Sequence, residues 1–110
     1  MENSYVVVIV TATSKEEAEK IALSLLNERL IACANIIGPV SSLFRWAGKV
    51  ERTDEHILLM KSRLDLFEKL SEMVKALHGY EVPEIIALPI VKGSVAYIEW
   101  LNGSLKPMDK

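Results

Sequence analysis

The chain has 110 residues, of which 50% are hydrophobic and 25% charged, and 13 Lys and Arg against 15 Asp and Glu give a formal net charge of −2. The length predicts a single domain spanning residues 1–110, and the composition excludes an intrinsically disordered chain. The slight acidic excess is unlike the basic surface of nucleic-acid-binding domains, so we expect no nucleic-acid partner.

We expect neither a membrane-spanning segment nor a signal peptide. No apolar run approaches the roughly 18 residues that a membrane-spanning helix needs, so we expect no membrane partner. The first residues, Met-Glu-Asn-Ser, carry neither the basic segment nor the apolar stretch of a signal peptide. The single cysteine, Cys33, excludes an internal disulfide. Together these features predict a cytoplasmic protein.

The first predicted elements are a strand and a helix. Tyr5–Thr13 is β-branched and apolar on both faces, which is typical of a central strand covered on two sides. Ser14 and Glu17 form a capping box at the start of the helix. Apolar residues then recur at helical spacing and predict one buried stripe: Ala18, Ile21, Ala22, Leu25 and Leu26.

Two long extended segments follow, Leu30–Trp46 and Val50–Lys61, and Ala47-Gly48 between them predicts a tight hairpin turn. Ser62 is predicted to cap a second helix, with Asp65 at the capping-box position. Gly79 is predicted to end this helix in a left-handed conformation.

The remaining elements complete a recognisable order. Glu84–Val91 is predicted as a strand, at an edge or with a bulge because it contains Pro89. Ser94 is predicted to cap a short last helix, before a flexible tail at 103–110. The order βαββαβ plus a C-terminal helix predicts an α+β fold, a ferredoxin-like sandwich with both long helices on one face of an antiparallel sheet.

The predicted hairpin is too long for a compact domain. Leu30–Trp46 would span roughly 55 Å if fully extended, whereas a domain of this size has a diameter of roughly 35 Å. Gly38-Pro39 is the natural place for a bend, because proline cannot donate to a ladder. Beyond the bend lie side chains too apolar for solvent: Leu43, Phe44, Trp46 and Val50. We therefore expect this arm to pack on another copy of the chain, in a homo-oligomer.

Three residues are candidates for chemistry. Cys33 fits a metal ligand or a reactive thiol, but a small buried hydrophobe is the commoner role. His56 is interpreted as a solvent-facing polar residue at a strand. His78 fits equally a cap of the helix C-terminus and a functional group, because loop 78–84 also holds a tyrosine and two carboxylates.

Basic residues on or near the hairpin are Arg45, Lys49, Arg52 and Lys61. They could line an anion pocket, although a solvated strand face is the commoner arrangement. The sequence has no Gly-rich phosphate loop, no nucleophile elbow and no HExxH motif, so we expect no enzyme.

Four segments resemble the CutA divalent-cation tolerance family. They are Glu-Arg-Leu-Ile-Ala-Cys-Ala-Asn-Ile (28–36), Ser-Leu-Phe-Arg-Trp-Ala-Gly-Lys-Val-Glu (42–51), His-Gly-Tyr-Glu-Val-Pro-Glu-Ile (78–85) and Tyr-Ile-Glu-Trp-Leu (97–101). The resemblance implies a homotrimer of ferredoxin-like subunits whose hairpins pair across subunits, which agrees with the homo-oligomer expected from the arm length. It also implies binding of copper or another divalent cation and no enzymatic activity, and we expect folding to require no metal.

The family also resembles the PII signalling proteins, which bind small ligands between subunits. This implies an alternative function, a sensor with an anionic ligand held by Lys49 and Lys61 in an intersubunit cleft. A third alternative is a stable scaffold for partner proteins.

Site residues follow from the resemblance by position. His78 corresponds to the family's loop histidine, with Cys33 and Glu81 as further candidate metal ligands. The ligand-cleft pattern corresponds to Trp46, Lys49, Glu51, Lys61, Tyr80 and Glu84. This chain departs from the family at three positions: Val10 and Leu77 stand where some members have cysteine and histidine, and Gly79 replaces the usual proline.

Overall fold

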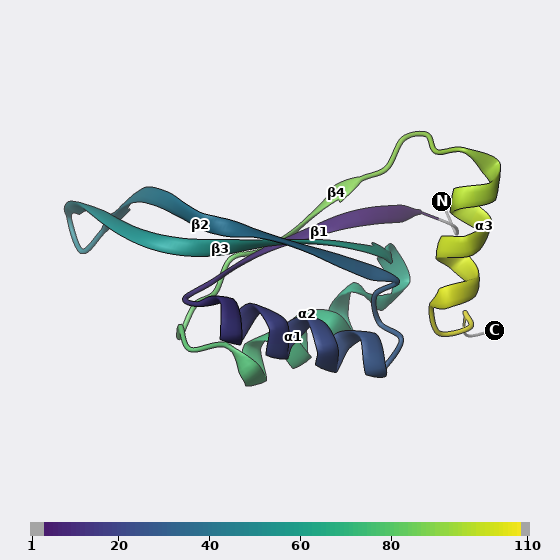
Figure 1. The fold of residues 1–110 in the computed structure, drawn as a ribbon, viewed down its shortest axis with the longest axis horizontal. Helices are drawn as coiled ribbons and strands as arrows, with labels where there is room; N and C mark the ends of the chain where they lie inside the picture. Colours follow the sequence, from purple (N-terminus) through teal and green to yellow (C-terminus); the bar gives the residue numbers. More distant parts are fainter. Residues whose placement is uncertain (1–3, 109–110) are drawn as a thin grey trace.

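The computed structural model describes residues 4–108. It consists of a four-stranded antiparallel sheet, in the order β2-β3-β1-β4, and three helices (Figure 1). The elements in chain order are β1 (Tyr5–Ala12), α1 (Lys15–Asn27), β2 (Cys33–Trp46), β3 (Lys49–Arg63), the 3-10 turn η1 (Leu64–Leu66), α2 (Phe67–Leu77), β4 (Ile85–Pro89) and α3 (Val95–Ser104). The predicted α+β class and the βαββαβ order are confirmed.

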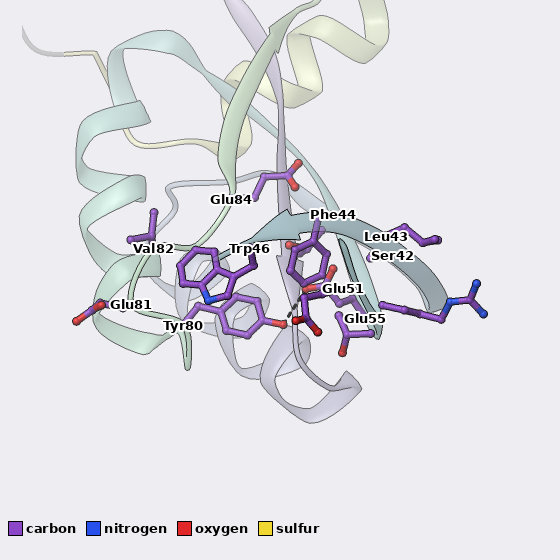
Figure 2. Close-up of a pocket in the computed structure, with 13 residues that line it drawn as sticks. Ser42, Leu43, Phe44, Trp46, Glu51, Glu55, Tyr80, Glu81, Val82 and Glu84 are labelled. Atoms are coloured by element: carbon purple, nitrogen blue, oxygen red, sulfur yellow. Dashed lines mark hydrogen bonds between the residues drawn. The ribbon is translucent and has the colours of Figure 1, made fainter. Parts of the chain in front are cut away.

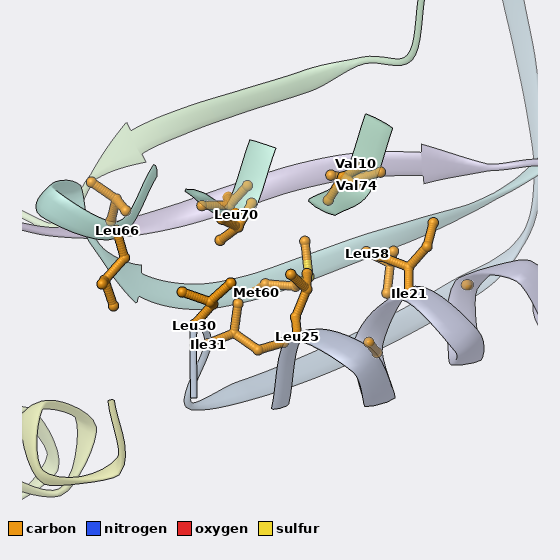
Figure 3. Close-up of a cluster of buried hydrophobic side chains, with 14 of the residues drawn as sticks. Val10, Ile21, Leu25, Leu30, Ile31, Leu58, Met60, Leu66, Leu70 and Val74 are labelled. Carbon is orange, nitrogen blue, oxygen red and sulfur yellow. The ribbon is translucent and has the colours of Figure 1, made fainter. Parts of the chain in front are cut away.

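The core lies between one face of the sheet and the two long helices. Helices α1 and α2 cover the same face, as predicted, and α3 stands at the end of the sheet away from the hairpin (Figure 1). Alternate residues of β1, Val6, Val8, Val10 and Ala12, are buried against these helices. They join leucine, isoleucine and methionine side chains from α1, α2 and β3 in one cluster (Figure 3).

The opposite face of the sheet is also apolar. β1 is central, as predicted, but its other alternate residues, Val7 and Ile9 among them, are only half-buried. Ile37, Ile86 and Leu88 are exposed on the same face, at register positions beside them. The expectation that β1 is covered on two sides is therefore wrong for a single copy, because both long helices lie on one side.

The helix boundaries confirm one predicted cap and correct another. Ser14 caps α1, since its hydroxyl accepts from the Glu17 N–H at 3.1 Å. Ser62 caps no helix, because pairing with β1 extends β3 as far as Arg63, and its buried hydroxyl donates to the Leu30 carbonyl. η1 intervenes before α2, which ends with His78 in an extended conformation; Gly79 has no positive φ.

The hairpin behaves as predicted at its turn and at its bend. Ala47 and Gly48 have φ values of 52° and 79°, and positive φ at both central residues is what a two-residue type I′ turn requires. The β2–β3 register shifts between Ile37 and Val40, at the expected bend. The arm projects well beyond the helices (Figure 1), and the chain measures 45 × 26 × 22 Å. Pro89 ends β4, an edge strand of this sheet.

The C-terminal segment is anchored to the domain. Leu105 is buried, and the Lys106 N–H donates to the Arg29 carbonyl at 2.9 Å. The segment expected as a flexible tail, 103–110, thus begins inside α3 and is held as far as Lys106; residues 109 and 110 lie outside the described ones. Among the described residues, no helix combines the length and the apolar character needed to cross a membrane.

Candidate functional site

A groove of about 900 Å³ lies between the hairpin arm and loop 78–84 (Figure 2). Its lining combines apolar, hydroxyl and acidic side chains with one arginine: Thr11, Ser42, Leu43, Phe44, Trp46, Glu51, Arg52, Thr53, Glu55, Tyr80, Glu81, Val82 and Glu84. This set contains four of the six predicted cleft residues and the candidate ligand Glu81. Lys49 and Lys61 are outside the lining.

Strand periodicity explains how the arm builds its side of the groove. Phe44 pairs with Glu51 across the two strands, and Ser42 pairs with Thr53. Directly paired residues project to the same side of an antiparallel ladder, and so do residues two apart on one strand. Trp46 therefore shares a face with Phe44, so that the aromatic side chains of β2 lie beside the carboxylate of Glu51 on β3.

His78 is buried at the base of loop 78–84, with a fully covered side chain. Its Nε2 bonds to the Thr11 carbonyl, which can only accept, and its Nδ1 accepts from the Tyr80 N–H at 2.9 Å. These two bonds select the neutral ring with the proton on Nε2. Coordination of a metal through His78 would require one of them to break.

Glu17, at the start of α1, ties this loop to the helix. Its carboxylate accepts from the Thr13 N–H and the Gly79 N–H, each at 2.8 Å, and lies 3.9 Å from Nε2 of His78. Burial raises the pKa of Glu17, but the hydrogen bonds from the Thr13 and Gly79 N–H groups outweigh this effect, so the pKa lies below its ordinary value of 4.5. The proline usual at position 79 in the family would offer no such donor.

Tyr80 connects the loop to the arm. Its hydroxyl donates to Oε2 of Glu55 at 2.9 Å, and its ring lies 5.0 Å from that of His78. Burial raises the pKa of the Tyr80 phenol above its ordinary value of 10.0, and the hydrogen bond to Glu55 and its charge raise it further. Tyr80 thus stays neutral at physiological pH and holds a carboxylate that is only 6% exposed.

The other candidate ligands lie apart from His78. Glu81 is on the groove, whereas Cys33 is at the far end of β2, where its Sγ lies 3.8 Å from the Tyr97 hydroxyl. Within residues 4–108, no three His, Cys, Asp or Glu side chains are grouped so that they could hold a metal ion. Lys61 donates to Oδ1 of Asn35 at 2.8 Å.

His56 is half-buried, so the interpretation as a solvent-facing residue holds only in part. Its Nδ1 is buried and has no hydrogen-bond partner within the described residues. The bend in β2 places Gly38 against the ring, where an added Cβ would lie 2.6 Å from Cδ2 of His56. Tertiary contact with the bend, which no local pattern reports, covers part of this side chain.

Sequence reasoning missed Glu17, Glu55 and Thr11 as parts of the site. Glu17 was accounted for as a helix cap, and Glu55 sits in an acidic strand that looks solvated. Thr11 contributes a backbone carbonyl, which carries no side-chain signal.

Comparison with known proteins agrees with this architecture. A sequence model of the family described as CutA1 divalent ion tolerance protein matches residues 6–104. The divalent-cation tolerance protein CutA of Thermus thermophilus is 50% identical over 96 residues, which cover 87% of this chain and 93% of that protein. The chloroplastic protein CutA of Arabidopsis thaliana is 46% identical over 101 residues, and the chain spans only 56% of its length.

Solved structures agree in the same way. The crystal structure of CutA1 from Oryza sativa superposes with a TM-score of 0.93 at 42% identity, covering 97% of this chain and 98% of that one. Fold and sequence together define a small α+β protein of the divalent-cation tolerance class. The chain belongs to the CutA1 divalent ion tolerance protein family, which confirms the family resemblance seen in its four segments.

Proposed function

We propose that this protein acts in divalent-cation tolerance by binding Cu²⁺ or a related divalent cation, without catalysing a reaction. The observation that carries the proposal is the charge of the groove. Its lining holds the carboxylates of Glu51, Glu55, Glu81 and Glu84 against the single guanidinium of Arg52 in the described part of the chain. Such a surface attracts cations and repels anions.

The anionic-ligand alternative receives less support from the same geometry. It requires Lys49 and Lys61 to face the ligand. Neither lines the groove of a single copy, although Lys49 pairs with Trp46 at the tip of the arm, and Lys61 already donates to Asn35. The family is named for tolerance and not for a reaction, which supports a non-enzymatic protein. The cytoplasm stays our prediction for its location.

We further propose that three copies assemble and share the cation. The helix-free face of the sheet exposes an apolar surface that includes Ile37, Ile86 and Leu88, and contiguous surfaces of this kind usually mark an interface. The described residues of one copy bring no three candidate ligands together. Ligands from two copies would complete a site, with Glu81 and Glu84 contributed by the exposed loop.

In this proposal His78 positions the loop and does not coordinate directly. Both of its ring nitrogens are engaged by backbone groups. Because the loop carries Glu81 and Glu84, loss of His78 would weaken cation binding indirectly.

Native mass spectrometry during titration with Cu²⁺ and then Zn²⁺ tests both parts. We expect a trimer that takes up a saturable, stoichiometric amount of Cu²⁺. Uptake should be lost in the double variant Glu81→Gln/Glu84→Gln and retained in Glu99→Gln, whose exposed carboxylate lies on α3 outside the groove. A trimer without stoichiometric uptake contradicts cation binding, and a monomer contradicts the shared site.

A further inference from the structure

The ring of His78 lies where three parts of the chain meet, and each of them contacts it. Its Nε2 bonds to the Thr11 carbonyl of β1, and its Nδ1 accepts from the Tyr80 N–H of the loop. On the third side, Oε1 of Glu17 on α1 lies 3.9 Å from Nε2. Because the side chain is fully covered, solvent does not replace a partner that the ring loses in this conformation.

A proton added to the ring conflicts with one of these contacts. The neutral ring carries its hydrogen on Nε2 and offers the lone pair of Nδ1 to Tyr80, whereas the charged ring carries hydrogens on both nitrogens. Nδ1–H and the Tyr80 N–H would then face each other as two donors, with only 2.9 Å between their nitrogens. The Tyr80 N–H, which has no second acceptor in the described chain, would lose its hydrogen bond.

Glu17 offers the charged ring a different partner. The pKa of Glu17 is lowered, so its carboxylate is ionised throughout the pH range above 4.5 and attracts an imidazolium. Tyr80 is the other titratable group in contact with the ring, and burial and its hydrogen bond to Glu55 on β3 raise its pKa above 10.0. Near neutral pH, where histidine side chains change charge, Glu17 therefore stays charged and Tyr80 stays neutral.

Tyr80 also fastens the loop to the arm. Its hydroxyl donates to Oε2 of Glu55 on β3 at 2.9 Å (Figure 2). Residues 81–83 form no hydrogen bond with the described chain, and the Gly79 N–H is held by Glu17 instead of by the arm. Loss of the bond between His78 and the Tyr80 backbone therefore frees the residue that connects the loop to β3.

We propose that His78 is a proton-operated latch of loop 78–84. With the neutral ring, the loop is fastened to the arm through Tyr80. With the charged ring, the imidazolium pairs with Glu17, the Tyr80 N–H is released, and the Tyr80 hydroxyl separates from Glu55. The latch concerns the attachment of the loop, so it holds or fails independently of the cation binding proposed above.

NMR spectroscopy of the metal-free protein at pH 7.5 and pH 5.5 tests the latch. At the lower pH we expect a protonated His78 ring and a lower heteronuclear NOE for Glu81 and Val82, because the released loop moves faster. The Tyr80 amide should exchange with solvent about fivefold or more faster, after correction for the intrinsic effect of pH, since two coupled equilibria usually shift each other by at least that factor.

Two variants separate the steps of the latch. His78→Asn keeps an acceptor near the position of Nδ1 but has no titrating ring, so Tyr80 protection and the loop NOE should be the same at both pH values. Tyr80→Phe removes only the hydroxyl bonded to Glu55, so the loop NOE should be low at both pH values. A general effect of pH on the fold or on the assembly would still appear in His78→Asn.

His56→Asn is the matched control, because it replaces the other histidine of the chain, and it should keep the pH dependence of the wild type. If His78→Asn does not fold, the wild-type spectra decide, since the Tyr80 amide must change together with the protonation of the His78 ring. A ring that stays neutral at pH 5.5, a Tyr80 amide that does not follow the ring, or the same pH dependence in His78→Asn as in wild type would overturn the proposal. An unchanged loop NOE in Tyr80→Phe would also overturn it.

Discussion

The role of His78 can be decided by its contribution to stability. Replacement by alanine removes the Nε2–H donor to the Thr11 carbonyl and the Nδ1 acceptor of the Tyr80 N–H. A buried polar group left without a partner costs about 1 to 3 kcal/mol, and His78→Ala leaves two. Water entering from the groove would partly satisfy these two groups. We therefore expect the free energy of unfolding to fall by about 3 kcal/mol, which is less than twice the upper end of that range.

Guanidinium denaturation followed by circular dichroism, at one fixed protein concentration, measures this loss. His56→Ala is the matched control, because it deletes the same ring where Nδ1 has no partner in the described chain. It should cost only about 1 kcal/mol, since no hydrogen bond is lost. His78→Asn keeps an acceptor near the position of Nδ1 and should fall between the two. If His78→Ala is no more destabilised than His56→Ala, the structural role argued for His78 is refuted.

Three further predictions concern contacts that position the site or the chain ends. Glu17→Gln should lower the free energy of unfolding by about 1 to 2 kcal/mol at pH 7. Because the folded-state pKa of Glu17 is lowered, its stabilisation is present above pH 4.5 and is lost as the pH falls through the lowered pKa. The difference in unfolding free energy between variant and wild type should therefore be smaller at pH 3 than at pH 7. Gly38→Ala should lower the free energy of unfolding by about 1 to 3 kcal/mol, because the added Cβ would press on His56. In a double-mutant cycle, His56→Ala should remove most of this loss, and additive losses would contradict the contact. Arg63→Ala should cost about 3 to 5 kcal/mol, because this buried guanidinium bonds to Asp65, to the Asn102 amide and to a carbonyl of the C-terminal segment; unfolding within 1 kcal/mol of wild type, as a rough limit, would refute it.

Local sequence patterns were sufficient to predict the secondary-structure elements. The apolar stripe after Ser14, the turn residues Ala47 and Gly48, and the bend at Gly38-Pro39 each act within a few residues of chain. The order of these elements, combined with the rule that crossover connections are right-handed, allows few sheet topologies. The α+β class could therefore be predicted. The excess length of the hairpin likewise predicted an arm that leaves the domain.

Pairing between distant segments decided the rest. Ser62 has the local pattern of a helix cap, yet pairing with β1 keeps it in a strand. His78, at the end of a helix, is held by Thr11 from a strand 67 residues away along the sequence. Glu17 and Glu55 entered the site only because α1 and the arm converge on loop 78–84. The sequence by itself thus determined which elements form and where they turn, since those preferences are local; the tertiary structure decided which side chains meet, because that depends on contacts whose partners lie far apart in the chain.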